Sequence, residues 1–382
     1  MIRLPLLVVA ALVAVLPAAA AAQSSIFGIR ALGVPSRALS ARATGTGGGY
    51  GYFDAESGMN PAAIGGIGTL TTVFTGMQEF RSSTSLGGTG DVRTARFPHI
   101  MIVGPVPGKP LAVSVGVSAY TDRDFALTSA DTALIRGQQV IVSDTVLARG
   151  GLNDVGLRAA WVRGGSVALG VGFHFITGSV RQELRRGFDN GAFLPTTQRA
   201  QISYNGIGVS AGAMVRVRGN LFAAAQARVD GSLQTYRDEL ALGTIALPAT
   251  FGVGLRWQPL PRLDIAGFAQ RRSWGRADSS LVAQGAAGAT DTWDAAFGFE
   301  WLRDARFPWQ RPLRLGARYG TLPFFVTRGQ QPREYALSAG TGFRFANGRG
   351  GIDLSLERVW RDDGTGRRES GWLIGAGVSV RP

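Results

Sequence analysis

Alternation of apolar and polar residues is the feature that most constrains this chain, because it recurs in runs of about ten residues or more. In one run, Trp293, Phe297 and Phe299 occupy odd positions while Asp294 and Glu300 occupy even positions. Successive side chains of a β-strand point to opposite faces, so this period of two predicts strands with one apolar and one polar face. Strands of soluble proteins are usually about five or six residues long, so these runs are unusually long.

The polar face carries formal charges in the middle of the strands, and the apolar face carries large residues with Trp or Tyr near its ends. This is the inverse of a soluble sheet and is typical of a transmembrane β-barrel, whose outer face meets lipid. Lipid offers no hydrogen-bond partners, and a closed sheet satisfies every backbone group internally. The sequence therefore predicts an all-β fold, a transmembrane antiparallel β-barrel.

The number of runs predicts about fourteen strands, an even number that returns both ends of the barrel to one side. Tight links such as Gly164-Gly165 alternate with longer ones such as 122–151 and 275–290, as short periplasmic turns alternate with extracellular loops. Pro248 should interrupt one ladder as a bulge or kink, and is a candidate for a gap in the wall. The expected strands are 69–80, 93–103, 110–121, 152–163, 166–186, 197–217, 220–237, 244–257, 261–274, 291–302, 312–327, 334–345, 350–361 and 369–381.

The N-terminus has the three parts of a secretory signal peptide: a basic start, an apolar stretch and small residues before Gln23. We therefore expect a signal peptide at 1–22, an N-terminal segment at 23–68 and the barrel at 69–382. The chain has no cysteine, so disulfides cannot hold an exported protein of this size together. Export and a barrel together predict the cell outer membrane as the location.

Residues 23–68 do not alternate, but they carry two short motifs. Arg30-Ala31-Leu32-Gly33 comes first, and Asn60-Pro61-Ala62 stands just before the first expected strand. In this order the chain resembles the FadL-type outer-membrane transporters of long-chain fatty acids and aromatic hydrocarbons, and equally their PorV-like relatives of the type IX secretion system.

The resemblance implies that Asn60, Pro61 and Ala62 belong to an N-terminal hatch that plugs a fourteen-stranded barrel. It also implies that hydrophobic substrates enter from outside, meet the hatch and leave sideways through an opening in the wall. Apart from the resemblance, an irregular segment of about 45 residues is uncommon in a compact domain unless it is functional or disordered. Placed before a barrel with a lumen, it could fill that lumen. The alternative is a flexible periplasmic tail.

Catalysis and metal binding have few candidate groups. The chain has two histidines, and His174 should point into the lumen. Ser179 should face the opposite side of the same strand, so this pair cannot act together. No His, Asp or Glu cluster has the spacing of a metal site. We therefore expect a protein that is not an enzyme, with no cofactor and no metal.

The net charge of +14 does not indicate nucleic-acid binding. Lys109 is the only lysine among 40 basic residues, and the arginines are scattered rather than clustered on one face. Many charges are expected to face the lumen, where the favoured interpretation is a structural lattice of ion pairs and the alternative is a path for anions. The lumen-facing polar candidates are Arg158, His174, Arg256, Glu300, Arg314 and Arg318.

The sequence thus predicts a monomer in contact with outer-membrane lipid. By resemblance it would be a passive transporter of hydrophobic small molecules, with a PorV-like protein-secretion partner as the main alternative and a general porin third. A transporter should have an apolar pocket with aromatic side chains and a break in the wall. A secretion partner should instead have an exposed apolar patch on its outer loops.

Overall fold

The computed structural model describes residues 25–85, 88–302, 311–326 and 329–381. The expected signal peptide at 1–22 and its junction at Gln23 lie outside these residues. None of the helices in the described part of the chain is long and apolar enough to cross a membrane.

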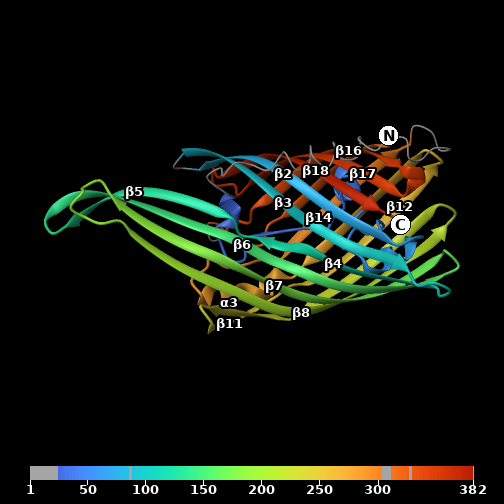
Figure 1. Ribbon diagram of the computed structural model, residues 1–382, viewed down its shortest axis with the longest axis horizontal. Helices are drawn as coiled ribbons and strands as arrows, with labels where there is room; N and C mark the ends of the chain where they lie inside the picture. The colour runs from blue at the N-terminus through green and yellow to red at the C-terminus, as the bar shows by residue number, and fades with distance from the viewer. Residues whose placement is uncertain (1–24, 86–87, 303–310, 327–328, 382) are drawn as a thin grey trace.

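The fold consists almost wholly of one antiparallel sheet (Figure 1). Its strands are β1 (Val34–Pro35), β2 (Thr71–Ser85), β3 (Gly88–Pro105), β4 (Leu111–Asp122), β5 (Phe125–Ile135), β6 (Gln138–Arg163), β7 (Val167–Phe188), β8 (Thr196–Arg218), β9 (Leu221–Asp230), β10 (Ser232–Arg237), β11 (Leu240–Ala246), β12 (Ala249–Leu260), β13 (Leu263–Arg272), β14 (Thr292–Trp301), β15 (Leu313–Thr321), β16 (Arg333–Phe345), β17 (Gly350–Asp362) and β18 (Arg368–Val380). The short helices are η1 (Ile26–Gly28), α2 (Ala41–Gly45), η2 (Pro61–Gly66), η3 (Trp274–Ala277), α3 (Asp278–Ala283) and η4 (Ala346–Gly348).

The sheet closes on itself because β18 pairs with β2 along thirteen residue pairs, from Arg368 with Thr84 to Val380 with Thr72. β9 and β10 are two parts of one long strand, as are β11 and β12, and β5 is an addition outside the barrel wall. Counted in this way the barrel has fourteen strands. The predicted fold class and strand number are confirmed.

Pro248 interrupts the sheet as expected, because it separates β11 from β12. The neighbouring strand is interrupted at Gly231, at the same level. The Leu247 amide donates a hydrogen bond of 2.9 Å to the Gly231 carbonyl, which bridges the two interruptions. Pro248 therefore marks a kink in two paired strands and not a gap in the wall.

The two faces of the wall have the predicted inverse polarity. The side chains of Trp293 and Phe297 are 56% and 57% exposed on the outer face, whereas Asp294 and Glu300 on the same strand are buried inside. Removing apolar area from water stabilises a protein by roughly 25 cal/mol per Å², so a soluble chain would not leave such a face uncovered. Hydrocarbon is the solvent that suits it.

The inward charges form a lattice of ion pairs. Arg314 contacts Glu300 at 2.6 Å and Asp353 at 2.7 Å, and Arg318 contacts Glu334 at 3.1 Å and Glu357 at 2.9 Å. Each pairing offsets part of the free energy that burial of a charge costs. The interpretation favoured from the sequence, a structural lattice, matches these contacts.

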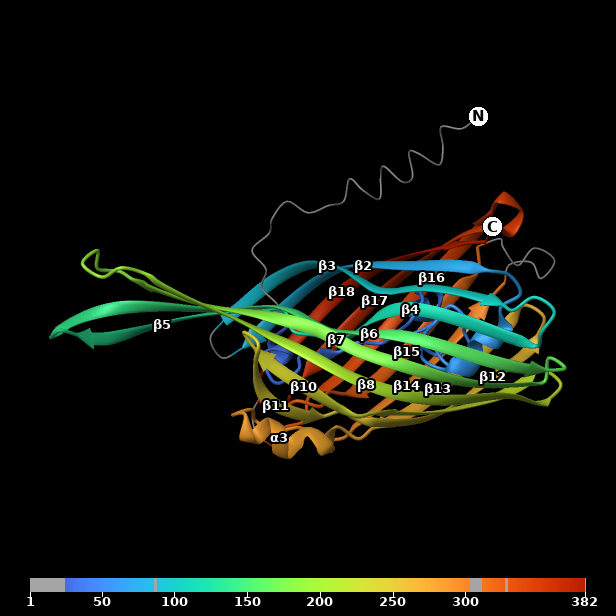
Figure 2. The same ribbon diagram turned by 60° about the horizontal axis from the view of Figure 1, so that its bottom comes forward.

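The segment of residues 25–70, here called the N-terminal segment, lies inside the barrel, where Figure 2 shows its blue helices behind the wall strands. Its approach to the wall depends on glycine. A Cβ atom at Gly316 would lie 2.1 Å from the Thr46 backbone, and one at Gly298 would lie 2.2 Å from the same residue. Wall glycines thus let the segment pack backbone to backbone, which accounts for part of the high glycine content.

The end of the barrel with the long connections differs from the sequence prediction in three places. The expected strand 312–327 ends at Thr321, as β15. The expected loop 122–151 instead contains β5 and the start of β6, which with the ends of β7 and β8 extend well beyond the wall (Figures 1 and 2). The expected loop 275–290 contains η3 and α3. These helices bury Trp274 and Leu281 in an apolar cluster with Phe324 from the next long connection.

Candidate functional site

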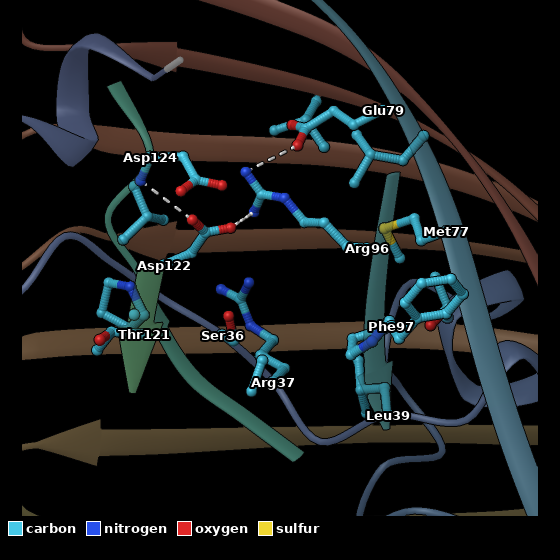
Figure 3. A pocket seen from close by; sticks show the side chains of 18 of the residues that line it. Ser36, Arg37, Leu39, Met77, Glu79, Arg96, Phe97, Thr121, Asp122 and Asp124 are labelled. Atoms are coloured by element: carbon cyan, nitrogen blue, oxygen red, sulfur yellow. Dashed lines mark hydrogen bonds and ion pairs between the residues drawn. The ribbon is translucent and has the colours of Figure 1, made fainter. Parts of the chain in front are cut away.

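A cavity of about 390 Å³ lies between the N-terminal segment and the inner faces of the wall strands. It receives side chains from the segment itself, from β2, β3 and β4, and from β15, β16, β17 and β18 across the lumen. Figure 3 shows Ser36, Arg37 and Leu39 of the segment opposite Met77 and Phe97 of β2 and β3. The N-terminal segment therefore forms one wall of this cavity.

Most of the charged groups that line the cavity form ion pairs. Arg96 forms ion pairs with Glu79, at 3.3 Å, and with Asp122, and the Asp124 amide donates to the Asp122 carboxylate at 3.2 Å (Figure 3). Arg37 reaches across the lumen to wall carboxylates. Mutual pairing leaves the apolar side chains as the surface available to a hydrophobic molecule. These side chains include Val34, Leu39, Met77, Phe97, Leu152, Val359 and Leu373.

The barrel wall has a gap beside this cavity, between β3 and β4. Paired residues run from Pro105 with Ala112 to His99 with Ser118, and beyond His99 the described residues of β3 pair with β2 alone. On the other side of the gap, β4 pairs with β6 and, at Asp122, with Val34 of β1.

Phe97 and Pro98 lie at the start of the gap, where β3 bulges against β2. Proline has no N–H to donate, so Pro98 cannot extend the ladder toward β4. Phe97 is 62% exposed, and both residues line the cavity. The cavity thus reaches the gap in the wall.

The motif Asn60-Pro61-Ala62 holds a tight turn against the wall. The Asn60 side chain accepts from the Ala62 amide at 3.0 Å and donates to the Tyr52 carbonyl at 3.0 Å, and it caps η2. The turn packs on two wall glycines: a Cβ at Gly212 would lie 2.0 Å from Asn60 Oδ1, and one at Gly170 would lie 2.4 Å from the Pro61 backbone. The motif does not line the cavity.

The other candidate residues lie on the inner face, where Arg256, Glu300 and Arg314 lie together and the remaining three lie apart from them. Arg256 pairs with Asp264 at 2.5 Å, and Glu300 pairs with Arg42 of the N-terminal segment at 2.9 Å as well as with Arg314. Of the six, only Arg318 lines the cavity beside the gap. Sequence reasoning missed Arg96, Asp122 and Phe97, and Pro98 is the one signal in the sequence that could have drawn attention to them.

His174 has partners that the sequence analysis did not anticipate. Ser179 was expected to diverge from it, but the neighbouring strand β8 brings Ser210 to 2.9 Å from His174 Nε2. Arg158 stands apart from the lattice, since in the described part of the chain its Nε and Nη1 have no hydrogen-bond partner. Within the same residues no group of three His, Asp or Glu side chains is placed to hold a metal ion.

The stability of the protein should depend on pH through Glu56 of the N-terminal segment. Burial, followed by the nearby Asp54, raises the pKa of its carboxyl above the usual range. A carboxyl whose pKa is higher in the folded state contributes stability at low pH, and that stability is lost as the pH rises through the raised value. Glu56→Gln should therefore remove part of the loss of stability between acid and neutral pH. Urea unfolding midpoints of both proteins at about pH 4 and about pH 8 measure this, and an equal loss in both would contradict it.

The fold and the gap define a class of protein, a fourteen-stranded barrel whose lumen holds its own N-terminal segment. No protein-family model and no curated protein matches the sequence. Solved structures do. A Pseudomonas aeruginosa FadL homologue aligns with a TM-score of 0.61 at 13% identity, covering 91% of this chain and 99% of that one.

Two toluene transporters align similarly. TodX of P. putida has a TM-score of 0.58 at 13% identity, over 91% of this chain and 99% of that one. TbuX of Ralstonia pickettii has a TM-score of 0.56 at 15% identity, over 90% and 98%. At such identities the likeness shows the fold. The chain has the fold of the FadL-type channels.

Proposed function

We propose that the protein mediates passive uptake of hydrophobic small molecules across the bacterial outer membrane. The observation that carries this proposal is the cavity that reaches a gap in the barrel wall at Phe97 and Pro98. The structures that share the fold supply the substrate class, since they are described as a FadL homologue, toluene transporters and a monoaromatic hydrocarbon channel. Fatty acids and monoaromatic hydrocarbons are the compounds to test.

The path we propose begins at the long-loop end of the barrel. There the apolar cluster around Trp274, Leu281 and Phe324 would receive the molecule. From there it would enter the cavity, whose apolar side chains face the gap, and leave between β3 and β4 into the hydrocarbon of the membrane. This step is favourable for a hydrophobic molecule, because it passes from the cavity to the membrane without exposing its apolar surface to water.

In this proposal the N-terminal segment plugs the lumen and forces the sideways exit, and the motif Asn60-Pro61-Ala62 anchors it to the wall. In the described residues four ion pairs tie the segment to the wall: Arg37 with Asp294 and Glu334, Arg42 with Glu300, and Arg381 with Glu56. Residues 1–22 would be the signal peptide that directs export, and the barrel would act as a monomer in contact with outer-membrane lipid.

A substrate could leave sideways through the gap between β3 and β4 or straight down the lumen, and one pair of substitutions distinguishes these two exits. Met77 lines the cavity beside the gap, and Met214 lines a second cavity of about 370 Å³ near the short turns. Met77→Trp should lower uptake of a labelled fatty acid or toluene several-fold by filling the path, while Met214→Trp should leave uptake unchanged. Loss of uptake in Met214→Trp alone would mean that the molecule passes straight down the lumen.

The plug itself is tested by deleting residues 24–66. The truncated barrel should admit a small hydrophilic sugar that the intact protein excludes, because the deletion empties the lumen. Uptake of sugar and of fatty acid is measured in liposomes that contain either protein. If permeability to both compounds were the same before and after truncation, the segment would not be a plug.

A second candidate function, a protein-binding barrel of the PorV-like kind, has one observation in its favour. The extension formed by β5 and its neighbours exposes large apolar residues, with Leu134 72% and Leu194 84% exposed. If uptake is the function, Leu134→Ser with Leu194→Ser should leave uptake of hydrophobic molecules intact. The second function would be favoured if neither the wild type nor the double variant took up hydrophobic molecules, and if the variant lost a secreted protein from the cell surface.

A further inference from the structure

Three side chains on adjacent strands form a chain of hydrogen bonds on the inner face of the barrel. Asp154 lies on β6, His174 on β7 and Ser210 on β8. His174 Nδ1 is 2.9 Å from each carboxylate oxygen of Asp154, and His174 Nε2 is 2.9 Å from Ser210 Oγ. All three side chains are buried.

The direction of these hydrogen bonds follows from the groups involved. Arg228 Nη1 contacts the Asp154 carboxylate at 2.6 Å, which favours its ionised form, and a carboxylate can only accept. The proton of a neutral His174 therefore sits on Nδ1, and Nε2 is left to accept from the Ser210 hydroxyl. This is the polarity that lets a histidine take a proton from a serine as the serine attacks a carbonyl.

Gly172 stands opposite Ser210 in the ladder and has no side chain, so the opposite residue of β7 does not cover the serine. A Cβ at that position would lie 2.5 Å from Ser210 Oγ, 3.2 Å from His174 Nε2 and 3.4 Å from Arg158 Cγ. The serine, the histidine and the arginine thus meet around this glycine, and a substrate atom would fit beside Ser210 only after one of these groups shifts.

Arg158 is an exception among the inner-face arginines. Arg314 and Arg318 each contact two carboxylates, whereas Arg158 is 5% exposed and its Nε and Nη1 lack hydrogen-bond partners in the described residues. Burying a guanidinium without partners is costly, so a structural role alone does not account for it. Arg158 pairs with Gly172 across β6 and β7, and its unpaired donors on the strand next to His174 are suited to a developing negative charge.

We propose that Asp154, His174 and Ser210 form a catalytic triad that hydrolyses carboxylic esters inside the barrel, with Arg158 stabilising the oxyanion. Ser210 Oγ bonds to the ester carbonyl carbon as its proton passes to His174 Nε2. The bond from that carbon to the alkoxy oxygen then breaks, and the alcohol leaves with the proton from His174. Water attacks the acyl-serine in the same way, which releases a carboxylic acid and restores the serine. The net reaction is ester and water to acid and alcohol.

The N-terminal segment covers this site. Asn60 and Pro61 rest on Gly212 and Gly170, which flank the catalytic residues along β8 and β7. The side chain of Asn60 holds the covering turn through its contacts with Ala62 and Tyr52. A substrate therefore reaches Ser210 when this turn moves, and loosening the turn should increase the rate. The inference does not depend on transport through the gap.

The test is covalent labelling of the folded full-length protein with a fluorophosphonate, which reacts with serines activated in this way. We expect the label on Ser210 by peptide mass spectrometry, none in Ser210→Ala, a rate at least tenfold lower in His174→Gln and a faster rate in Asn60→Ala. The matched control is Ser338→Ala. Ser338 is an equally buried inner-face serine that donates to Glu357 at 3.0 Å instead of to a histidine, so this variant should label like the wild type.

Turnover separates catalysis from mere reactivity of the serine. Hydrolysis of p-nitrophenyl butyrate should be lost in Ser210→Ala, and Arg158→Gln should lower kcat by about 100-fold with little change in KM. Retention of barrel structure in each variant is checked by electrophoretic mobility before and after heating. If folded wild type and folded Asn60→Ala both left Ser210 unlabelled, or labelled it no faster than Ser338, the three residues would be a structural network and the proposal would be wrong.

Discussion

Arg318→Met is expected to lower the free energy of unfolding by about 3–5 kcal/mol. Arg318 is buried between Glu334 and Glu357, and without it the one partner that Glu357 would keep among the described residues is the Ser338 hydroxyl, at 3.0 Å. An unpaired carboxylate in this enclosed lumen costs far more than the pair itself contributes. Urea unfolding of the barrel in lipid vesicles measures the change.

The control for this prediction is Arg237→Met. Arg237 and Asp238 also carry opposite charges, but both are largely exposed and their side chains are 3.9 Å apart. Exposed pairs contribute about 0–1 kcal/mol, so the control should unfold close to the wild type. Equal losses in the two variants would mean that the lumen screens its charges as bulk water does, and the ion-pair lattice would not be structural.

Phe297→Arg is expected to cost about 2–4 kcal/mol, because the position is in the middle of β14 on the outer face. An arginine there would have to place its charge in hydrocarbon or bend toward the interface. Leu194→Arg, in the connection between β7 and β8, should change stability by less than about 0.5 kcal/mol. The measurement is again urea unfolding in vesicles, and a Phe297→Arg variant as stable as the wild type would place that face in water.

The barrel could be predicted from the sequence because each wall strand has one face in lipid and one in the lumen. Trp293, Phe297 and Glu300 reveal their strand in this way. The extension could not be predicted by the same means. Leu127 and Leu134 of β5 are exposed, and so are most of the polar residues between them, so the strand has no buried face to impose a period of two.

The candidate site was harder to predict because it depends on register. His174 meets Ser210, 36 positions further along the chain, because the pairing of β7 with β8 sets Ser210 opposite Gly172. A shift of one residue would turn the serine to the outer face. Pro98 and Pro248 both interrupt a ladder of hydrogen bonds. The wall opens at Pro98 but not at Pro248, because at Pro248 the neighbouring strand is interrupted at the same level and a hydrogen bond joins the two strands.

The large apolar side chains on the outer face of this wall require hydrocarbon around them. Ala295 and Ala296 are adjacent alanines on β14, the first exposed on the outer face and the second buried inside, and the chain has no native cysteine. Ala295→Cys and Ala296→Cys can each be labelled with a bimane fluorophore in vesicles that contain brominated lipid. We predict strong quenching by the bromine atoms at position 295 and little at 296. Weak quenching at both positions would contradict a membrane-spanning barrel.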